Sequence, residues 1–316
     1  MSSRKIFFRA DASPEIGYGH FIRTLALADM LRDEFECVFY TQQPTEYQVR
    51  ELEKVCSFVS LPTDDTKFTV FLDFLDGSEI VVLDNYFYTS DYQLKIKNKG
   101  CKLVCIDDMH DKHYFADAVI NHDLVEEKDF DKEPYTNLYL GLGYALLRKP
   151  FLQPLKEINR IKGKWTICFG GSDAHNLTTK VAKILSSRDE ISMISAIVGD
   201  AFQYKEELMR IEKVEVFSRL SADEMAQQYL SSENVCCSLS SVCFESLACG
   251  CKTFAGYYVD NQKVGYEKFV KHNLVVPLGN LLETDLKILK TKDETPLNKI
   301  NFSQVKDNFL LMFKSL

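Results

Sequence analysis

Short hydrophobic runs rich in β-branched residues alternate along the chain with longer segments in which hydrophobic residues recur every three or four positions. The runs are typical of buried strands, and the longer segments of helices that place one face on a sheet. This alternation predicts a parallel sheet that is covered on both faces. In the first half, strands are expected at Lys5–Arg9, Cys37–Thr41, Ser57–Ser60, Ile80–Asp84, Lys102–Asp107 and Ala118–Asn121.

The first predicted helix runs from about Gly19 to Phe35 and follows a glycine-bearing loop at the end of the first strand. The hydrophobic face of this helix is broad, which indicates that the helix packs on the sheet. The residues of this face are Ile22, Leu25, Ala26, Met30 and Leu31.

The segment Arg148–Lys164 interrupts the pattern with two prolines, one glycine and little β character, which is typical of a linker. Beyond it the alternation restarts, again with a strand, a glycine-bearing loop and a helix. The predicted strands are Trp165–Phe169, Ser192–Val198, Val214–Phe217, Val235–Ser238, Thr253–Tyr258 and Val275–Leu278. The predicted helices are Asn176–Leu185, Ala222–Leu230, Val242–Cys249, Asn261–Lys271 and a final one, Phe302–Lys314.

A chain of 316 residues exceeds the size at which a single hydrophobic core stops growing. We therefore expect two α/β domains, each Rossmann-like and doubly wound, over residues 1–150 and 151–316. Ligands bind at the carboxyl ends of the strands in such sheets. The expected site is thus a cleft across which the two domains face each other.

Composition and charge narrow the classes of partner. With 46% hydrophobic and 27% charged residues the chain is an ordinary globular protein. A formal net charge of −8 offers no basic surface for a nucleic-acid backbone, so nucleic acid is not an expected partner. No hydrophobic run reaches the roughly 18 residues of a membrane helix, and Ile6–Phe8 is too short for a signal peptide. A cytoplasmic protein without membrane insertion is expected.

The ten cysteines do not indicate a disulfide framework or a metal site. Several of them lie in or beside hydrophobic runs, where a free thiol behaves as a small hydrophobic group. The close groupings Cys236-Cys237, Cys243 and Cys249-Gly250-Cys251 lack the CxxC spacing of a zinc site. We expect buried thiols, no metal and no cofactor.

The stretch Gly17-Tyr18-Gly19-His20 stands where the first strand leads into the first helix. Its glycines permit positive φ angles, and the helix start offers unpaired amides and the positive end of a dipole. That dipole favours a neutral imidazole, which is the state of a general base. A histidine that only caps or packs explains the spacing of His20 at least as well.

Polar residues follow two more strands of the first half. Asp84-Asn85-Tyr86 ends one strand and Asp107-Asp108 follows another, so all five lie at the edge of the sheet where ligands bind. A pair of carboxylates can bind a metal or act as acid and base. Turn formation and helix capping account equally well for both groups.

Three comparable groups follow strands of the second half. Gly170 and Gly171 can form an amide nest for a phosphate. Ser240 and Ser241 begin a helix that contains Glu245. Such a helix start can bind a pyrophosphate, and Glu245 can accept hydrogen bonds from the ribose hydroxyls. A capping box is the alternative, but Ser241 and Glu245 are four residues apart, where the box requires three. Asn261-Gln262 follow the next strand, where a helix cap is the alternative.

Taken together, these motifs occur in the order and spacing of one family. They are RADASPEIGYGHFIRTLALA, DNY, IDD, the NH after VI, GLGYALLRKPF, FGGSDAHN, SLSSVCFESL and YVDNQ. They resemble the UDP-2,4-diacetamido-2,4,6-trideoxy-β-L-altropyranose hydrolases of pseudaminic acid biosynthesis, over about residues 5 to 272. The wider similarity is to nucleotide-sugar glycosyltransferases of the GT-B type, which have two Rossmann domains and include the transferase that makes lipid II.

The resemblance implies a metal-independent hydrolysis in which water attacks the anomeric carbon of a UDP-sugar with inversion and releases free sugar and UDP. His20 in the N-terminal domain would be the catalytic base. The sugar would be bound by Asp11, Gly17, Gly19, Tyr86, Asn261 and Gln262. The C-terminal domain would bind UDP through Gly170, Gly171, Ser240, Ser241 and Glu245. Asn85 and Phe244 depart from the family, which carries a histidine and a polar residue at these positions.

Two other functions fit the same sequence. One is an inverting glycosyltransferase in which His20 activates an acceptor hydroxyl, and the other is a UDP-sugar binding protein without turnover. The first domain has no hydrophobic or basic patch for membrane docking, which counts against a lipid-linked acceptor. A Ser-His-Asp triad order, a Walker loop and a GxSxG elbow are absent from the sequence, so hydrolases and ATPases of those kinds are not supported. No feature indicates an oligomeric state, and the tail beyond about Leu281 has no functional interpretation.

Overall fold

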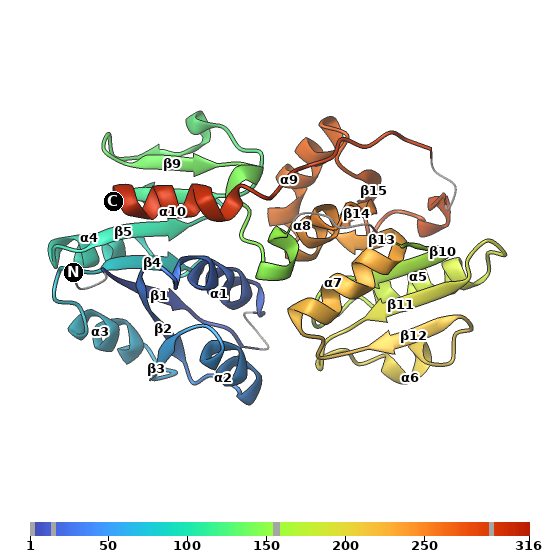
Figure 1. Cartoon of the computed structure of the whole chain (residues 1–316), viewed down its shortest axis with the longest axis horizontal. Helices are drawn as coiled ribbons and strands as arrows, with labels where there is room; N and C mark the ends of the chain where they lie inside the picture. The colour runs from blue at the N-terminus through green and yellow to red at the C-terminus, as the bar shows by residue number, and fades with distance from the viewer. Residues whose placement is uncertain (1–3, 14–16, 154–158, 291–293) are drawn as a thin grey trace. The chain divides into compact units, whose positions relative to one another are not determined.

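The computed structural model describes residues 4–13, 17–153, 159–290 and 294–316. The chain divides into two compact units, Met1–Lys149 with Ser303–Leu316, and Pro150–Phe302 (Figure 1). Each unit has its own parallel sheet and its own hydrophobic core. Part of the predicted linker, residues 154–158, lies outside the described residues.

The first unit is built on a seven-stranded parallel sheet in the order β3-β2-β1-β4-β5-β7-β9. Strands β2 and β3 follow β1 on one side of it. The chain then crosses over, and β4 pairs with β1 on its other side. Doubly wound sheets bind ligands at such a reversal. The strands are β1 (Lys5–Ala10), β2 (Glu36–Gln42), β3 (Ser57–Leu61), β4 (Ile80–Asp84), β5 (Lys102–Ile106), β7 (Ala118–Asn121) and β9 (Asn137–Leu140). A separate parallel pair is formed by β6 (His113–Tyr114) and β8 (Asp131–Lys132).

The first four helices of this unit pack on the sheet, and its last helix packs on the first helix and on a 3-10 turn. One face of the sheet is covered by a core that contains Phe7, Tyr40, Phe71, Val81 and Leu103. The helices are α1 (Gly19–Leu31), α2 (Glu46–Glu53), α3 (Thr66–Asp73), α4 (Ser90–Asn98) and α10 (Val305–Ser315). The short 3-10 turns are η1 (Glu127–Asp129), η2 (Leu142–Tyr144) and, where the chain leaves this unit, η3 (Lys149–Leu152).

The second unit repeats the plan with six parallel strands in the order β12-β11-β10-β13-β14-β15, so its order reverses at β10 and β13. Its core contains Trp165, whose ring lies 4.8 Å from that of Phe254. The strands are β10 (Ile161–Cys168), β11 (Met193–Ile197), β12 (Val214–Phe217), β13 (Ser232–Ser238), β14 (Lys252–Tyr257) and β15 (Val276–Asn280). The helices are α5 (Leu177–Ser186), α6 (Lys205–Leu208), α7 (Ala222–Ser231), α8 (Ser241–Ala248) and α9 (Asp260–Lys271), with the turn η4 (Leu286–Ile288).

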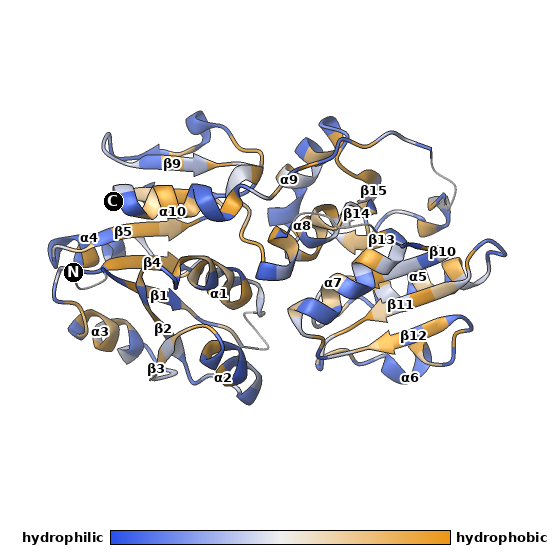
Figure 2. Ribbon diagram, viewed as in Figure 1, coloured by the Kyte–Doolittle hydropathy of each residue, from blue (hydrophilic) through white to orange (hydrophobic). Residues whose placement is uncertain are grey.

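The predicted strands are present, and the differences lie mostly at the ends of elements. Helix α1 stops at Leu31 rather than Phe35, because the chain turns at the polar Arg32-Asp33-Glu34. Strand β10 begins at Ile161, inside the predicted linker. Strand β9 was not predicted, since its four residues carry no long periodic signal. Figure 2 shows β4, β5 and β11 as hydrophobic and α6 as hydrophilic.

The cysteines and the helix lengths bear on two predictions made from the sequence. All ten cysteines are free thiols; Cys56 is half-buried and the others are buried, as predicted. Within the described ranges, every helix is too short or too polar to cross a lipid bilayer.

The final helix, α10, packs with the first unit, whereas the predicted boundary of 151–316 assigned it to the second. Phe313 contacts the ring of Phe35 after α1, and Phe309 contacts Tyr144 in η2, with ring centroids 6.3 and 5.6 Å apart. The sequence shows that one face of α10 is hydrophobic. The sequence does not show which unit that face covers, because both units have hydrophobic surfaces on which a helix can pack.

We predict that Phe309→Ala destabilises the first unit by about 3–5 kcal/mol, because it removes a fully buried ring. Hydrogen exchange should show lost protection in α1 but not in β10. Leu311→Ala is the matched control, since Leu311 lies on the same helix and is 70% exposed. Loss of protection in β10 with none in α1 would contradict this assignment of α10.

Candidate active site

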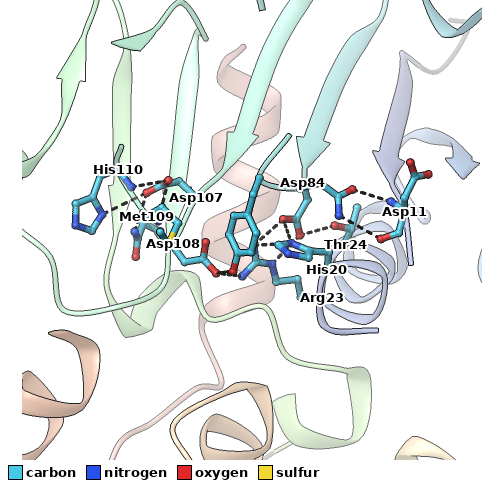
Figure 3. Close-up of polar contacts among 12 residues, drawn as sticks. Asp11, His20, Arg23, Thr24, Asp84, Asp107, Asp108, Met109 and His110 are labelled. Atoms are coloured by element: carbon cyan, nitrogen blue, oxygen red, sulfur yellow. Dashed lines mark hydrogen bonds and ion pairs between the residues drawn. The ribbon is translucent and has the colours of Figure 1, made fainter. Parts of the chain in front are cut away.

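The polar strand ends of the first unit meet at the edge where its strand order reverses. His20 is the second residue of α1, Asp84 is the last residue of β4, and Asp108 follows β5 closely. Figure 3 shows that His20, Arg23 and Thr24 of α1 point toward Asp84. Side chains from α1 and from the ends of two strands thus form one group.

His20 is held by Asp84. Its Nδ1 lies 2.7 Å from Oδ1 of Asp84, and both side chains are buried. A carboxylate only accepts hydrogen bonds, so Nδ1 carries the proton and donates it to Asp84. Nη2 of Arg23 lies 3.1 Å from the same nitrogen and, being a donor only, bonds to Asp84 at 2.6 Å instead. This tautomer leaves Nε2 as the acceptor nitrogen, and in the described part of the chain no group donates to it. The arrangement is that of an oriented proton acceptor.

Asp84 receives further hydrogen bonds from the same helix face. Arg23 donates from Nε and Nη2 at 2.6 Å each, and the Thr24 hydroxyl donates at 2.8 Å. Burial disfavours the charged carboxylate, but the charge of Arg23 and the hydrogen bonds from Arg23 and His20 outweigh it and hold the pKa of Asp84 well below its usual range. Arg23 was not predicted, although its position three residues after His20 places it on the same face of the helix.

Tyr86 lies beside the histidine and is 47% exposed. The rings of His20 and Tyr86 meet edge to face with centroids 4.6 Å apart. The Tyr86 hydroxyl donates to Oδ2 of Asp108 at 2.9 Å, and Arg23 donates to the same oxygen at 3.0 Å. Lys112 donates to the backbone carbonyl of Tyr86 at 3.2 Å. The tyrosine is therefore held through both its hydroxyl and its backbone.

Asp11 differs from our expectation of a sugar contact. Its side chain has no exposed surface and is paired with both terminal nitrogens, Nη1 and Nη2, of the Arg9 guanidinium and with Lys67 at 3.2 Å. The Asn85 side chain bonds to the backbone of Asp11 through two hydrogen bonds, 2.7 and 3.2 Å long. Asp11 and Asn85 thus join the ends of β1 and β4, and the carboxylate is not available to a ligand.

The glycines near His20 have different roles. Gly17 adopts a φ of 83° and donates to the carbonyl of Ser13 at 2.8 Å, so this position favours glycine. Gly19 is the exposed first residue of α1, and a Cβ atom there would meet no group of the described residues within 4 Å. A role of these two glycines in binding the sugar stays a prediction.

The two neighbouring aspartates after β5 separate into different roles. Asp107 is buried and accepts from the amides of Met109 and His110 at 3.1 and 2.8 Å, so it forms the turn that was one of its alternatives. Asp108 instead faces Arg23 and Tyr86. Asp108 and Tyr86 line an open pocket of the first unit together with Arg23, Asp84 and Lys112.

In the second unit, the predicted groups lie at the carboxyl ends of the neighbouring strands β10, β13 and β14. Gly170 adopts a φ of 88°, and a side chain on Gly199 would collide with the backbone of Gly171. Ser240 precedes α8 and makes no side-chain cap, so a capping box is absent. The amide of Cys243 donates to the backbone carbonyl of Ser240 at 2.8 Å, and no serine hydroxyl of the described residues caps this helix start. Ser241 is half-buried and Glu245 is buried.

The last two predicted residues lie in the first turn of α9. The Asn261 side chain is exposed. Gln262 accepts a hydrogen bond from the amide of Tyr258 at 3.2 Å, which is a cap-like role. The Tyr258 hydroxyl donates to the carbonyl of Phe169 at 3.3 Å and so links the end of β14 to the loop after β10.

Comparisons with known proteins agree with the similarity that the motifs indicate. No family model matches the chain. A protein of Methanocaldococcus jannaschii without an assigned function is 29% identical over 317 residues, which cover 92% of this chain and 65% of the relative. UDP-2,4-diacetamido-2,4,6-trideoxy-beta-L-altropyranose hydrolase of Campylobacter jejuni is 28% identical over 288 residues, which cover 85% of this chain and 100% of the relative.

Solved structures with a similar fold cover nearly the whole chain. MurG of Acinetobacter baumannii is 11% identical with a TM-score of 0.60 over 98% of this chain and 95% of its own. A putative UDP-N-acetylglucosamine 2-epimerase of Listeria monocytogenes is 14% identical with a TM-score of 0.61, over 100% and 96% of the two chains. S. aureus MnaA with UDP is 10% identical with a TM-score of 0.62, over 99% and 96%. The chain is similar to the hydrolases that its motifs indicate, and its fold is the GT-B type with two Rossmann-like domains.

We predict that Asp84→Asn lowers the free energy of unfolding of the first unit by about 3 kcal/mol at neutral pH, because it leaves Arg23 buried without one of its carboxylates. The pKa of Asp84 is lowered in the folded state, so its stabilisation is present above the unfolded-state pKa of about 3.9 and is lost as the pH falls below it.

The difference between the native chain and Asp84→Asn in urea unfolding should therefore shrink from about pH 5 to pH 3. Asp73→Asn, at the exposed end of α3, is the control and should show no comparable difference. An Asp84→Asn difference that stays constant over this pH range would contradict the proposed ion pairing.

Proposed function

We propose that the chain hydrolyses a UDP-linked 2,4-diacetamido-2,4,6-trideoxy sugar to free sugar and UDP, as a step in the biosynthesis of pseudaminic acid or a related nonulosonic acid. The observation that carries this proposal is the buried His20–Asp84 pair, whose Nδ1–Oδ1 distance is 2.7 Å. The Campylobacter jejuni relative is named for this activity. Solved structures with a similar fold include a putative UDP-N-acetylglucosamine 2-epimerase and MnaA with UDP.

In this reaction His20 acts as general base. Its Nε2 takes a proton from water while the water oxygen bonds to the anomeric carbon, and the bond from that carbon to the UDP oxygen breaks with its electron pair. Asp84 stabilises the imidazolium that forms, because its carboxylate already accepts the Nδ1 proton. Inversion follows because water and UDP lie on opposite faces of the sugar. Tyr86, edge-on to His20, contributes to the wall that contacts the sugar.

The second unit binds UDP in this proposal. The amides at the start of α8 and the hydroxyls of Ser240 and Ser241 are oriented donors for the pyrophosphate, whose charge grows as the bond breaks. The backbone at Gly170 and Gly171 is open for close approach of a phosphate. Glu245, one turn into the helix, accepts from the ribose hydroxyls, and Asn261 with Gln262 contacts the sugar.

We predict that His20→Ala reduces kcat by about 10²- to 10⁴-fold and leaves the Kd for UDP unchanged, because the base acts only in the chemical step. Release of UDP without an acceptor measures turnover. His20→Gln, which keeps most of the side-chain volume, should lose the same activity, and the exposed His272→Ala should not.

Labelled water oxygen should appear in the free sugar and not in UDP. Label in UDP would contradict attack at the anomeric carbon. Turnover that requires an added acceptor would identify a glycosyltransferase, and UDP-sugar binding without any turnover would identify a binding protein.

We predict that Ser240→Ala and Ser241→Ala each raise the Kd for UDP about tenfold, since each removes a hydrogen bond to a charged group. Calorimetry with UDP measures this effect. Ser187→Ala, at the exposed end of α5, is the control and should bind UDP as the native chain does. Unchanged affinity in both site variants would contradict the placement of the pyrophosphate at α8.

A further inference from the structure

Asp108 presents one occupied and one unoccupied carboxylate oxygen at the pocket of the first unit. Its Oδ2 accepts from Arg23 at 3.0 Å and from the Tyr86 hydroxyl at 2.9 Å. No donor among the described residues bonds to its Oδ1. The side chain is 17% exposed and lines the pocket together with Tyr86 and Met109. The free oxygen therefore belongs to a carboxylate that its partners hold in place.

The same contact sets the direction of the Tyr86 hydroxyl. A carboxylate oxygen has no proton to give, so the phenol proton lies between Tyr86 and Asp108. Any further hydrogen bond at the Tyr86 oxygen must then be one that it accepts. Arg23 fixes this arrangement, since its guanidinium donates hydrogen bonds to both Asp84 and Asp108. The wall beside His20 thus offers an acceptor, Oδ1 of Asp108, to a ligand.

Met109 completes this part of the wall with hydrophobic surface. It follows Asp108 directly, lines the same pocket and is 39% exposed. A group that suits both neighbours carries an N–H or O–H donor and a small hydrophobic part. A secondary acetamido substituent has both, with its N–H toward the carboxylate and its methyl toward the thioether.

We propose that Asp108 is a specificity-determining residue that selects a sugar substituent with a hydrogen-bond donor, an acetamido N–H above all. The inference rests on the proposed function, because it places the sugar of a UDP-sugar in this pocket. Its physical basis is that a ligand without the donor leaves an anionic oxygen desolvated and unpaired. That penalty corresponds to a loss of about 10- to 100-fold in affinity.

The test measures binding on His20→Ala protein, so that turnover does not enter. The probes are the UDP-linked 2,4-diacetamido sugar and two analogues in which an azide replaces the acetamido group at C2 or at C4, with UDP as the common reference. An azide has no donor. We expect one azido analogue to bind about 10- to 100-fold more weakly than the parent, while the Kd for UDP is the same throughout.

Asp108→Asn, made in the His20→Ala protein, is the discriminating variant. Its amide oxygen can keep the hydrogen bonds from Arg23 and Tyr86, while its NH₂ replaces the free oxygen and so turns an acceptor into a donor. We expect the preference for acetamido over azide to fall below about threefold. Tyr86→Phe is a second variant that removes only an exposed hydroxyl, and it should weaken the preference in part. Asp65→Asn, an exposed carboxylate of the same unit, should leave the preference intact.

Equal binding of the parent and both azides overturns the inference, and so does a preference that survives Asp108→Asn in protein with unchanged UDP affinity. Failure of the proposed function has a different signature. If native protein does not hydrolyse the parent but the Asp108-dependent preference is present, hydrolysis fails and the inference stands. If the parent is hydrolysed with no such preference, only the inference fails.

Discussion

Much of the first unit depends on the buried negative charge of Asp84. A carboxylate without contact to water is strongly unfavourable unless hydrogen bonds and opposite charge replace its hydration. Here His20, Arg23 and Thr24 supply both from a single face of α1. The same contacts fix the position of the helix against the end of β4 and fix which nitrogen of His20 carries a proton. Stability and the proposed chemistry therefore share one interaction, and a change that weakens the ion pair also disorients the base.

The other strand-end carboxylates show how similar residues take different roles through their partners. Asp11 is enclosed by Arg9 and Lys67 and joins strands. Asp107 accepts backbone amides and shapes a turn. Asp108 lines the pocket, its Oδ2 accepts from Arg23, and its Oδ1 accepts from no donor among the described residues. A carboxylate at the ligand edge of a sheet is thus a candidate for ligand contact only when its own neighbours leave an oxygen unused.

Local sequence patterns predicted the two α/β units and nearly all of the strands, because buried strands have a strong hydrophobic signal. They also placed His20, Tyr86, Ser240 and Ser241 at strand ends, where the geometry of parallel sheets puts ligands. They did not show that His20 pairs with Asp84, since those residues are far apart in the sequence and many side chains at that edge are polar. The enclosure of Asp11 was missed for the same reason, since it depends on Lys67 from α3.

The return of α10 to the first unit has a consequence for synthesis. The first unit is discontinuous in the chain, because its sheet is made early and the helix that covers Phe35 and Tyr144 is made after the whole second unit. Domains commonly fold in the order in which the ribosome makes them. Here the second unit is complete while the first still exposes the hydrophobic surface that α10 will cover. The nascent chain therefore carries a complete sheet whose unit keeps a hydrophobic surface uncovered until α10 emerges.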